Sequence, residues 1–172
     1  MEIWDLYDEN KNLTGRTMVR GEIIPDNCYH LVVHVWIKNN KGEFLISQRS
    51  EDRKSCPLMW ECSGGSVIQG ENSIEGAVRE VKEELGIDLK AEEGKLVYSK
   101  VRKMVDGHRF NDIMDVWLFE YNGEVDLKKA TTAEVRDFKW MNKSEIKEYF
   151  DEKKLVQTLG YFFDEVPNDI MI

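Results

Sequence analysis

The pattern of apolar positions along the chain predicts several strands and one well-defined helix. Residues 31–37 are rich in β-branched side chains, which is typical of a buried strand. Residues 39–42 have the composition of a turn, so we expect them to join this strand to a second one at 43–49 in a hairpin. The same criteria predict the remaining strands at 3–7, 15–24, 96–105, 113–121 and 137–141.

The helix is predicted over residues 73–85. Asn72 is a suitable N-cap, Glu75 follows it at the spacing of a capping box, and Gly86 is a natural C-terminal stop. A last helix is expected to begin near Ser144 and to continue, with a break, towards Phe163. Strands flanked by separated helices indicate an α/β fold in which helices cover both faces of a mixed β-sheet. Residues 50–70, which include Pro57, are expected to form a loop.

Length and composition favour one domain over residues 1–172, with a hairpin extension at 1–27 and a helical segment at 144–172. The hydrophobic fraction of 41% is too high for a disordered chain. No apolar run is long enough to cross a bilayer, and the first residues do not form a basic and then apolar leader. We therefore expect a cytoplasmic protein without a membrane partner, whose three cysteines are reduced thiols.

The formal net charge of −9 argues against a nucleic-acid partner, because non-specific binding to phosphates uses basic surface. The acids are not evenly spread, since five of them lie between residues 71 and 84. Glu80, Glu83 and Glu84 have the i, i+3 and i+4 spacings of helix neighbours, where like charges repel. The residues alone allow two interpretations: a solvated acidic face balanced by Arg79 and Lys82, or a site for a hard cation such as Mg²⁺.

The surrounding motif distinguishes these interpretations. Gly65 is followed after five residues by Glu71, and after seven more by the run REVKEELGI, which extends from Arg79 to Ile87. This pattern resembles, at every defined position, the signature of the Nudix hydrolases. The resemblance implies an α/β/α sandwich and an enzyme that cleaves a diphosphate linked to another group, usually a nucleoside, with Mg²⁺ or Mn²⁺ as cofactor. The expected partner is then a small-molecule diphosphate substrate.

The resemblance also implies roles for individual residues. Glu80, Glu83 and Glu84 would bind metal together with the backbone carbonyl of Gly64, and Arg79 would orient a glutamate. Glu80 would alternatively accept the proton of the attacking water. The supporting motif positions are Gly65, Glu71 and Gly86. The chemistry agrees, because diphosphate hydrolysis needs cations at the phosphoryl oxygens and a positioned water but no nucleophilic side chain.

Two further candidates lie outside the motif. Glu134 precedes the strand around Trp140, where many Nudix proteins have an additional metal ligand or base, although a solvated loop residue remains the alternative. Arg49 ends a predicted strand, where the family often has an arginine near substrate phosphate, and a surface role is equally compatible. For His30 and His34 we expect structural roles within the sheet, and for His108 a solvated turn.

Two rival functions remain open. The segments around Trp4 and His30 resemble Nudix proteins close to isopentenyl-diphosphate isomerase, which moves a proton without hydrolysis. That chemistry needs a cysteine and a glutamate, but this sequence has Gly64 and Met114 at those positions, so we favour the hydrolase. A non-catalytic ligand-sensing module is expected to lose motif glutamates, and none is lost. Residues 1–27 and the stretch after Ser144 are candidates for substrate specificity or for a homodimer contact.

Overall fold

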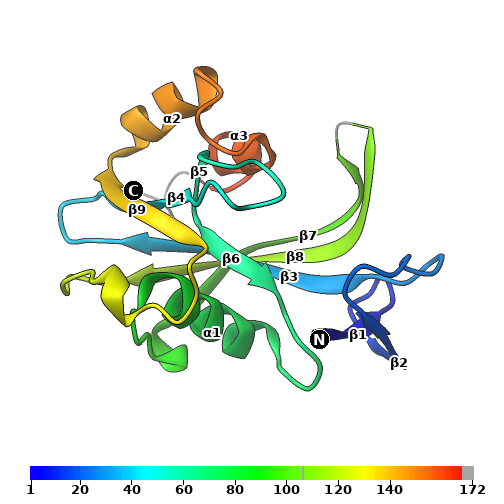
Figure 1. Ribbon diagram of the computed structural model, residues 1–172. Helices are drawn as coiled ribbons and strands as arrows, with labels where there is room; N and C mark the ends of the chain where they lie inside the picture. Colours follow the sequence, from blue (N-terminus) through cyan, green and yellow to red (C-terminus); the bar gives the residue numbers. More distant parts are fainter. Residues whose placement is uncertain (106, 168–172) are drawn as a thin grey trace.

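A mixed β-sheet forms the middle layer of the structure (Figure 1). The computed structural model describes residues 1–105 and 107–167. Strands β3 (His30–Lys38) and β8 (His108–Glu120) run parallel to each other at the centre, and the other pairs of the sheet are antiparallel. The remaining strands of this sheet are β4 (Phe44–Arg49), β5 (Trp60–Glu61), β6 (Ser63–Ser66), β7 (Lys95–Val105) and β9 (Val135–Met141).

Helices cover both faces of this sheet, which confirms the predicted α/β/α sandwich (Figure 1). Helix α1 (Ser73–Leu85) lies on one face, and α2 (Lys143–Asp151) and α3 (Tyr161–Asp164) lie on the other. Successive side chains of β3 alternate between the two layers, as the strand period requires. Val33 and Val35 pack towards α1, whereas Trp36 packs against the aromatic side chains of α3.

The predicted helix over residues 73–85 is confirmed at both ends. The side chain of Asn72 accepts a hydrogen bond from the backbone of Glu75, whose side chain bonds back to the Asn72 backbone, as in a capping box. Gly86 ends the helix in the left-handed conformation, with a φ of 68°. These capping hydrogen bonds satisfy backbone groups at the helix ends that have no partner within the helix. The local sequence therefore sets the limits of the helix.

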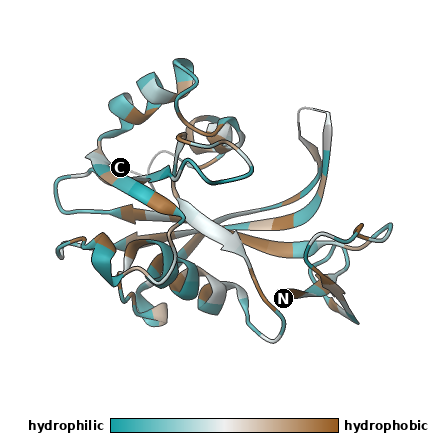
Figure 2. Ribbon diagram, viewed as in Figure 1, coloured by the Kyte–Doolittle hydropathy of each residue, from teal (hydrophilic) through white to brown (hydrophobic). Residues whose placement is uncertain are grey.

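Several predicted strand limits differ from the observed ones. The expected hairpin of β3 and β4 is reduced to one register pair, Lys38 with Phe44, because β3 then pairs with β6. The predicted loop at 50–70 contains β5 and β6, since the Ser-Gly-Gly-Ser sequence of β6 has no apolar alternation that would indicate a strand. Figure 2 shows β6 nearly white between the brown segments of its neighbours. Strand β8 begins five residues before the predicted start.

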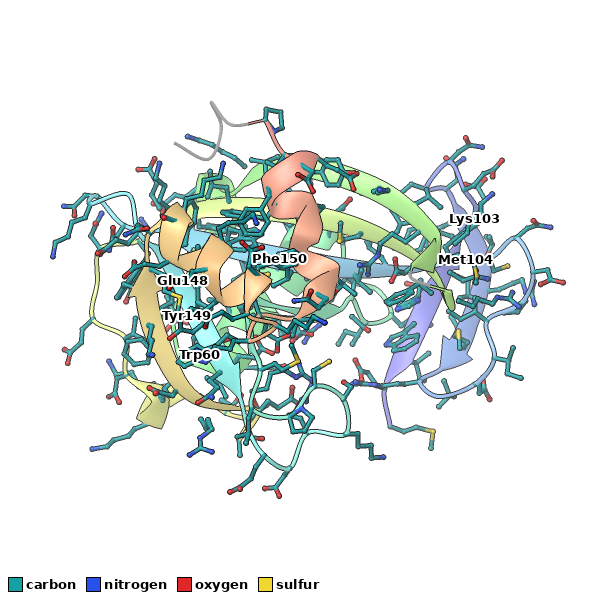
Figure 3. All side chains as sticks on the ribbon, turned by 90° about the horizontal axis from the view of Figure 1, so that it is seen from above. Trp60, Lys103, Met104, Glu148, Tyr149 and Phe150 are labelled. Atoms are coloured by element: carbon teal, nitrogen blue, oxygen red, sulfur yellow. The ribbon has the colours of Figure 1, made fainter. Side chains whose placement is uncertain are left out.

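The C-terminal layer follows the prediction of an interrupted helix. Helix α2 ends at Asp151, and the chain resumes helical structure in the 3₁₀ turn η3 (Gln157–Gly160), which leads into α3. Figure 3 shows Tyr149 of α2 near Trp60 of β5, and the rings of Trp60 and Tyr149 meet edge to face at 5.9 Å, whereas the ring of Phe150 lies 5.2 Å from that of Phe163. The last five residues of the predicted segment 144–172 lie outside the described part of the chain.

The N-terminal residues form a separate antiparallel pair, β1 (Ile3–Tyr7) and β2 (Leu13–Val19). Reciprocal backbone hydrogen bonds between Tyr7 and Tyr29, of 2.8 and 2.9 Å, attach this pair to the main sheet. The predicted second strand at 15–24 is displaced towards the N-terminus, and it ends before Gly21, which has a φ of 98°. Short 3₁₀ turns complete the structure at Ala91–Glu93 and Leu127–Lys129. No described helix has the length and apolar character that a membrane crossing needs.

The cap of α1 gives a first prediction. Asn72→Ala should lower the free energy of unfolding by about 1 kcal/mol, because it removes the capping-box partner of the Glu75 backbone. Urea unfolding measures this change. Asn142→Ala is a matched control, since Asn142 makes the same capping box at the start of α2. Equal losses in both variants support the assignment of the caps, whereas an unchanged stability of Asn72→Ala would contradict it.

Candidate active site

The site is built where α1 packs against β6. The Oε2 atom of Glu84 accepts hydrogen bonds from the Ser63 hydroxyl and, at 3.2 Å, from the backbone N–H of Gly64. The next residue, Gly65, lies against the Glu80 carboxyl so closely that a Cβ there would be 2.5 Å from Glu80 Oε1. Helix and strand can approach to this distance only because Gly65 has no side chain.

Arg79 holds the surrounding acids together. Its Nε donates to Glu71 Oε1 at 2.8 Å, and its Nη1 donates to Glu80 Oε1 at 2.9 Å and to Glu83 Oε2 at 3.1 Å. Its Nη2 donates to the backbone carbonyl of Ser66 at 2.9 Å. The planar guanidinium can serve several acceptors at once because its N–H groups form a rigid fork. One cation thus neutralises part of the charge of three glutamates.

Two carboxyl groups of the site are buried. Glu80 is 9% exposed and Glu84 is 5% exposed. Burial raises the pKa of Glu80 to about 7, although the neighbouring Arg79 guanidinium acts in the opposite direction. Burial, together with the charges of Glu61 and Glu80, raises the pKa of Glu84 well above its usual range, against the hydrogen bonds from Ser63 and Gly64. The protein alone therefore leaves the negative charge of this site incompletely compensated.

These groups face an open cavity of about 560 Å³. The lining includes most of the residues that the sequence singles out, namely Gly64, Gly65, Arg79, Glu80, Glu83, Glu84 and Glu134. Glu71 lies outside it and holds Arg79, while Gly86 caps the far end of α1. The N-terminal segment contributes Glu2 and Arg20 to the same cavity.

The residues fit a divalent cation, although they do not form a ready cage. Over residues 1–105 and 107–167, no three His, Cys, Asp or Glu side chains converge as metal ligands. The reason is visible in the contacts: Arg79 engages Glu80 and Glu83, and Arg53 engages Glu134. The donor set consists of carboxylate and carbonyl oxygens, which hard cations prefer. A cation among these carboxylates would replace the contacts of Glu80 and Glu83 with Arg79.

Besides the predicted Arg79, two arginines that the sequence analysis did not assign to the site line this cavity, whereas the candidate Arg49 does not. Arg49 does not line this cavity; it is buried, pairs with Glu61 and donates through Nε to the Ser55 carbonyl at 3.0 Å. Arg53 and Arg20 line it instead. Arg53 belongs to a loop and Arg20 follows β2, and no local periodicity marks either residue as part of the site. Their place in the site depends on long-range folding.

Two histidines of the central strand lie on the face opposite α1. The ring of His30 stacks on Trp4 with centroids 4.3 Å apart, and its Nδ1 has no hydrogen-bond partner among the described residues. Burial lowers the pKa of His30, whereas the charge of Asp112 and a hydrogen bond to the Asn111 backbone act in the opposite direction. The Nδ1 of His34 lies 2.8 Å from the Tyr161 hydroxyl. Burial lowers the pKa of His34 to about 3, and the nearby Arg102 adds to this effect, so the ring is neutral. The side chain of His108 lies outside the described part of the structure.

Comparison with known proteins identifies the family of this chain. The sequence profile of the NUDIX domain matches residues 29–164. An uncharacterized Nudix hydrolase of Listeria monocytogenes is 38% identical over 149 residues, which cover 85% of this chain and 83% of that protein. The chain belongs to the Nudix hydrolase family. Members of this family are hydrolases that generally use divalent metal ions.

Two further comparisons concern the fold and the rival function. The solved structure of DR0079 from Deinococcus radiodurans matches with a TM-score of 0.69 at 19% identity, covering 88% of this chain and 90% of that one, which shows a common fold. An isopentenyl-diphosphate Delta-isomerase of Corynebacterium diphtheriae is 33% identical over 89 residues, covering 51% of this chain and 48% of the isomerase. The likeness to the isomerase is therefore confined to about half of each chain.

The burial of Glu84 gives a second prediction. In the presence of a metal chelator, Glu84→Gln should be more stable than the parent, and the gain should grow as the pH rises above about 4.3, the ordinary pKa of a glutamate in an unfolded chain. A raised folded-state pKa means that the folded parent favours a protonated Glu84; this preference is met at low pH and becomes a cost as pH rises, whereas glutamine stays neutral. Unfolding by urea at each pH measures the difference. The exposed Glu148→Gln is the control, and a gain independent of pH would show that the buried charge of Glu84 is not its cause.

Proposed function

We propose that this protein is a metal-dependent Nudix hydrolase that cleaves the diphosphate bond of a nucleoside diphosphate or a nucleoside diphosphate-linked compound by attack of water. The observation that carries the proposal is the pair of buried carboxyl groups of Glu80 and Glu84, which lie against β6, the strand that contains Gly64 and Gly65 and is called the glycine strand. Glu134 lines the same cavity. Such under-compensated carboxylates have little structural use, but they suit Mg²⁺ or Mn²⁺ and an anionic substrate.

The residues of the site would have separate roles in the reaction. Glu80, Glu83, Glu84 and the Gly64 carbonyl would hold the cation, which when bound supplies charge neutralisation at the phosphoryl oxygens and a more acidic water. Glu134 or Glu80 accepts the proton of the water as its oxygen attacks phosphorus. The bridging P–O bond then breaks, and the leaving oxygen carries away the electron pair. Two phosphorylated products result.

Two arginine side chains of the cavity are suited to bind the substrate phosphates. Arg53 pairs with Glu134, and Arg20 pairs with Glu2 at 2.6 Å, and all four residues line the cavity. Both ion pairs are partly exposed, and such pairs stabilise the fold little. An exchange of these partners for phosphate oxygens is therefore inexpensive. The N-terminal segment would in this way help to bind the diphosphate.

The isomerase is the weaker alternative. Cys62, the nearest cysteine to the required position, is buried in the core, and burial raises the pKa of its thiol well above the usual range. Met114, which occupies the position where a glutamate is required, is also part of this core. Neither side chain lines the cavity with the glutamates. A non-catalytic sensing module has no particular feature in its favour, because every motif glutamate is present.

A substrate panel tests the proposed function. The protein with Mg²⁺ or Mn²⁺ should release a nucleoside monophosphate from at least one compound among nucleoside di- and triphosphates, nucleotide sugars and dinucleoside polyphosphates, or adenosine 3′,5′-bisphosphate from coenzyme A. Chromatography and phosphate detection measure the products. Absence of all turnover, together with proton exchange into isopentenyl diphosphate, would replace the hydrolase by the isomerase. Binding without either reaction would support a sensing module.

Glu84→Gln provides the corresponding variant test. We expect kcat to fall by at least about 100-fold, because a ligand to the cation and a carboxylate charge are lost at the centre of the site. Circular dichroism should show an unchanged fold. Glu148→Gln, on the exposed side of α2, should retain full activity. Wild-type turnover in Glu84→Gln would mean that the reaction takes place elsewhere.

A further inference from the structure

A second cavity adjoins the glutamate site. It has a volume of about 410 Å³, within the range of small-molecule pockets, and lies against the face of β3 that carries His34. The two cavities share Arg53 and the strand residues Gly64, Gly65 and Ser66 in their linings. A substrate whose diphosphate occupies the first cavity can therefore extend its attached group into the second.

The buried charges of the second cavity are already paired within it. Arg102 binds Asp112 through two hydrogen bonds of 2.7 Å, and both side chains are almost completely buried. Arg49 pairs with Glu61 in the same lining. Bidentate pairs of this kind are strong and geometrically fixed, so they shape the cavity and leave little net charge for a ligand.

His34 differs from these ion pairs, because one nitrogen of its ring has a hydrogen-bond partner and the other has none among the described residues. The Tyr161 hydroxyl lies 3.1 Å from the indole N–H of Trp36, which can only donate, so the phenol oxygen accepts there. Its proton is then available for His34 Nδ1, its nearest acceptor at 2.8 Å. Cys62, which also lines the cavity, offers only a weak sulfur acceptor.

This chain of hydrogen bonds determines the tautomer of His34. If Nδ1 accepts from Tyr161, the proton of the neutral ring resides on Nε2. Among the described residues, Nε2 makes no hydrogen bond, and it is not among the atoms sealed from solvent. His34 thus offers the second cavity a fixed, neutral N–H donor without a partner. His30 also lines this cavity, but its unpartnered Nδ1 is sealed from solvent.

We infer that His34, held by Tyr161 and Trp36, is a specificity-determining residue whose Nε2–H donates to an uncharged oxygen, a hydroxyl or carbonyl, on the group attached to the diphosphate. This inference rests on the proposed function and names the substrate class within it. A hydrocarbon group is disfavoured, because it would cover the N–H and two ion pairs without hydrogen bonds. A nucleotide sugar, which has hydroxyl oxygens on the group attached to its diphosphate, meets the requirement.

The tautomer can be measured in the free protein, with no substrate. ¹⁵N spectra of imidazole-labelled protein should show the proton of His34 on Nε2 in the wild type. Tyr161→Phe removes the donor to Nδ1 and should release the ring to a mixture of tautomers. Tyr98→Phe is the matched control, because Tyr98 stacks on Tyr161 but its hydroxyl binds Glu165. A wild-type proton on Nδ1 would overturn the inference.

Recognition is tested with ADP-ribose and UDP-glucose. His34→Leu should raise KM for the compound that is turned over by about tenfold, with little change in kcat, because one hydrogen bond to a neutral acceptor is lost. His34→Gln, which keeps an N–H donor near the same place, should recover most of the loss. The inhibition constant of imidodiphosphate, which needs only the glutamate site, should stay unchanged.

The outcomes separate this inference from the proposed function. If neither nucleotide sugar is hydrolysed, their Kd values in Mg²⁺, measured by calorimetry, replace KM in the same comparison. Unchanged affinities in His34→Leu, an equal loss of imidodiphosphate binding, or no binding of either nucleotide sugar would each refute the role of His34. Hydrolysis of other panel compounds would leave the proposed function intact in all three cases.

Discussion

The packing of α1 against the glycine strand β6 is the constraint on which the site depends. This contact puts the carboxyl groups of Glu80 and Glu84 out of full solvation, and only Gly65 leaves room for the first of them. Burying charge without full compensation opposes folding. Arg79 offsets part of that cost for Glu80 by donating to it as well as to Glu71 and Glu83.

Strand β3 connects this site to the rest of the molecule. One of its faces packs under α1, and the other carries His34 and Trp36 towards Tyr161 of the C-terminal layer. Glycine strand β6 pairs with β3 and separates the two cavities with little side-chain volume. Groups that come from distant parts of the chain thereby line two adjoining cavities.

How far the sequence predicts this arrangement depends on the range of the interactions. Helix α1 was predicted to the residue because its caps and its acid spacing are local, and the motif that it carries identified the family. Strand β6 was missed because Ser-Gly-Gly-Ser has no periodic pattern, and its pairing with β3 is a tertiary contact.

The cations and the second cavity show the same limit. Arg53, Arg20 and Tyr161 take their places through loops and through the return of the C-terminal segment, which no short pattern encodes. Arg49 had a local signal, but its buried pair with Glu61 directs it to the second cavity. The roles assigned to Glu134 and to the motif glutamates remain proposals that the geometry supports, since these residues line one cavity.

We propose above all that the buried glutamates of α1 form a divalent cation site. The most direct test is a crystal structure of the protein with Mn²⁺, in which anomalous scattering locates the ion. We predict a peak within coordination distance of the carboxyl oxygens of Glu80 and Glu84 and the Gly64 carbonyl, with Arg79 turned away from Glu80. A peak remote from these groups, or full retention of the Arg79–Glu80 contact at saturating Mn²⁺, would contradict the account.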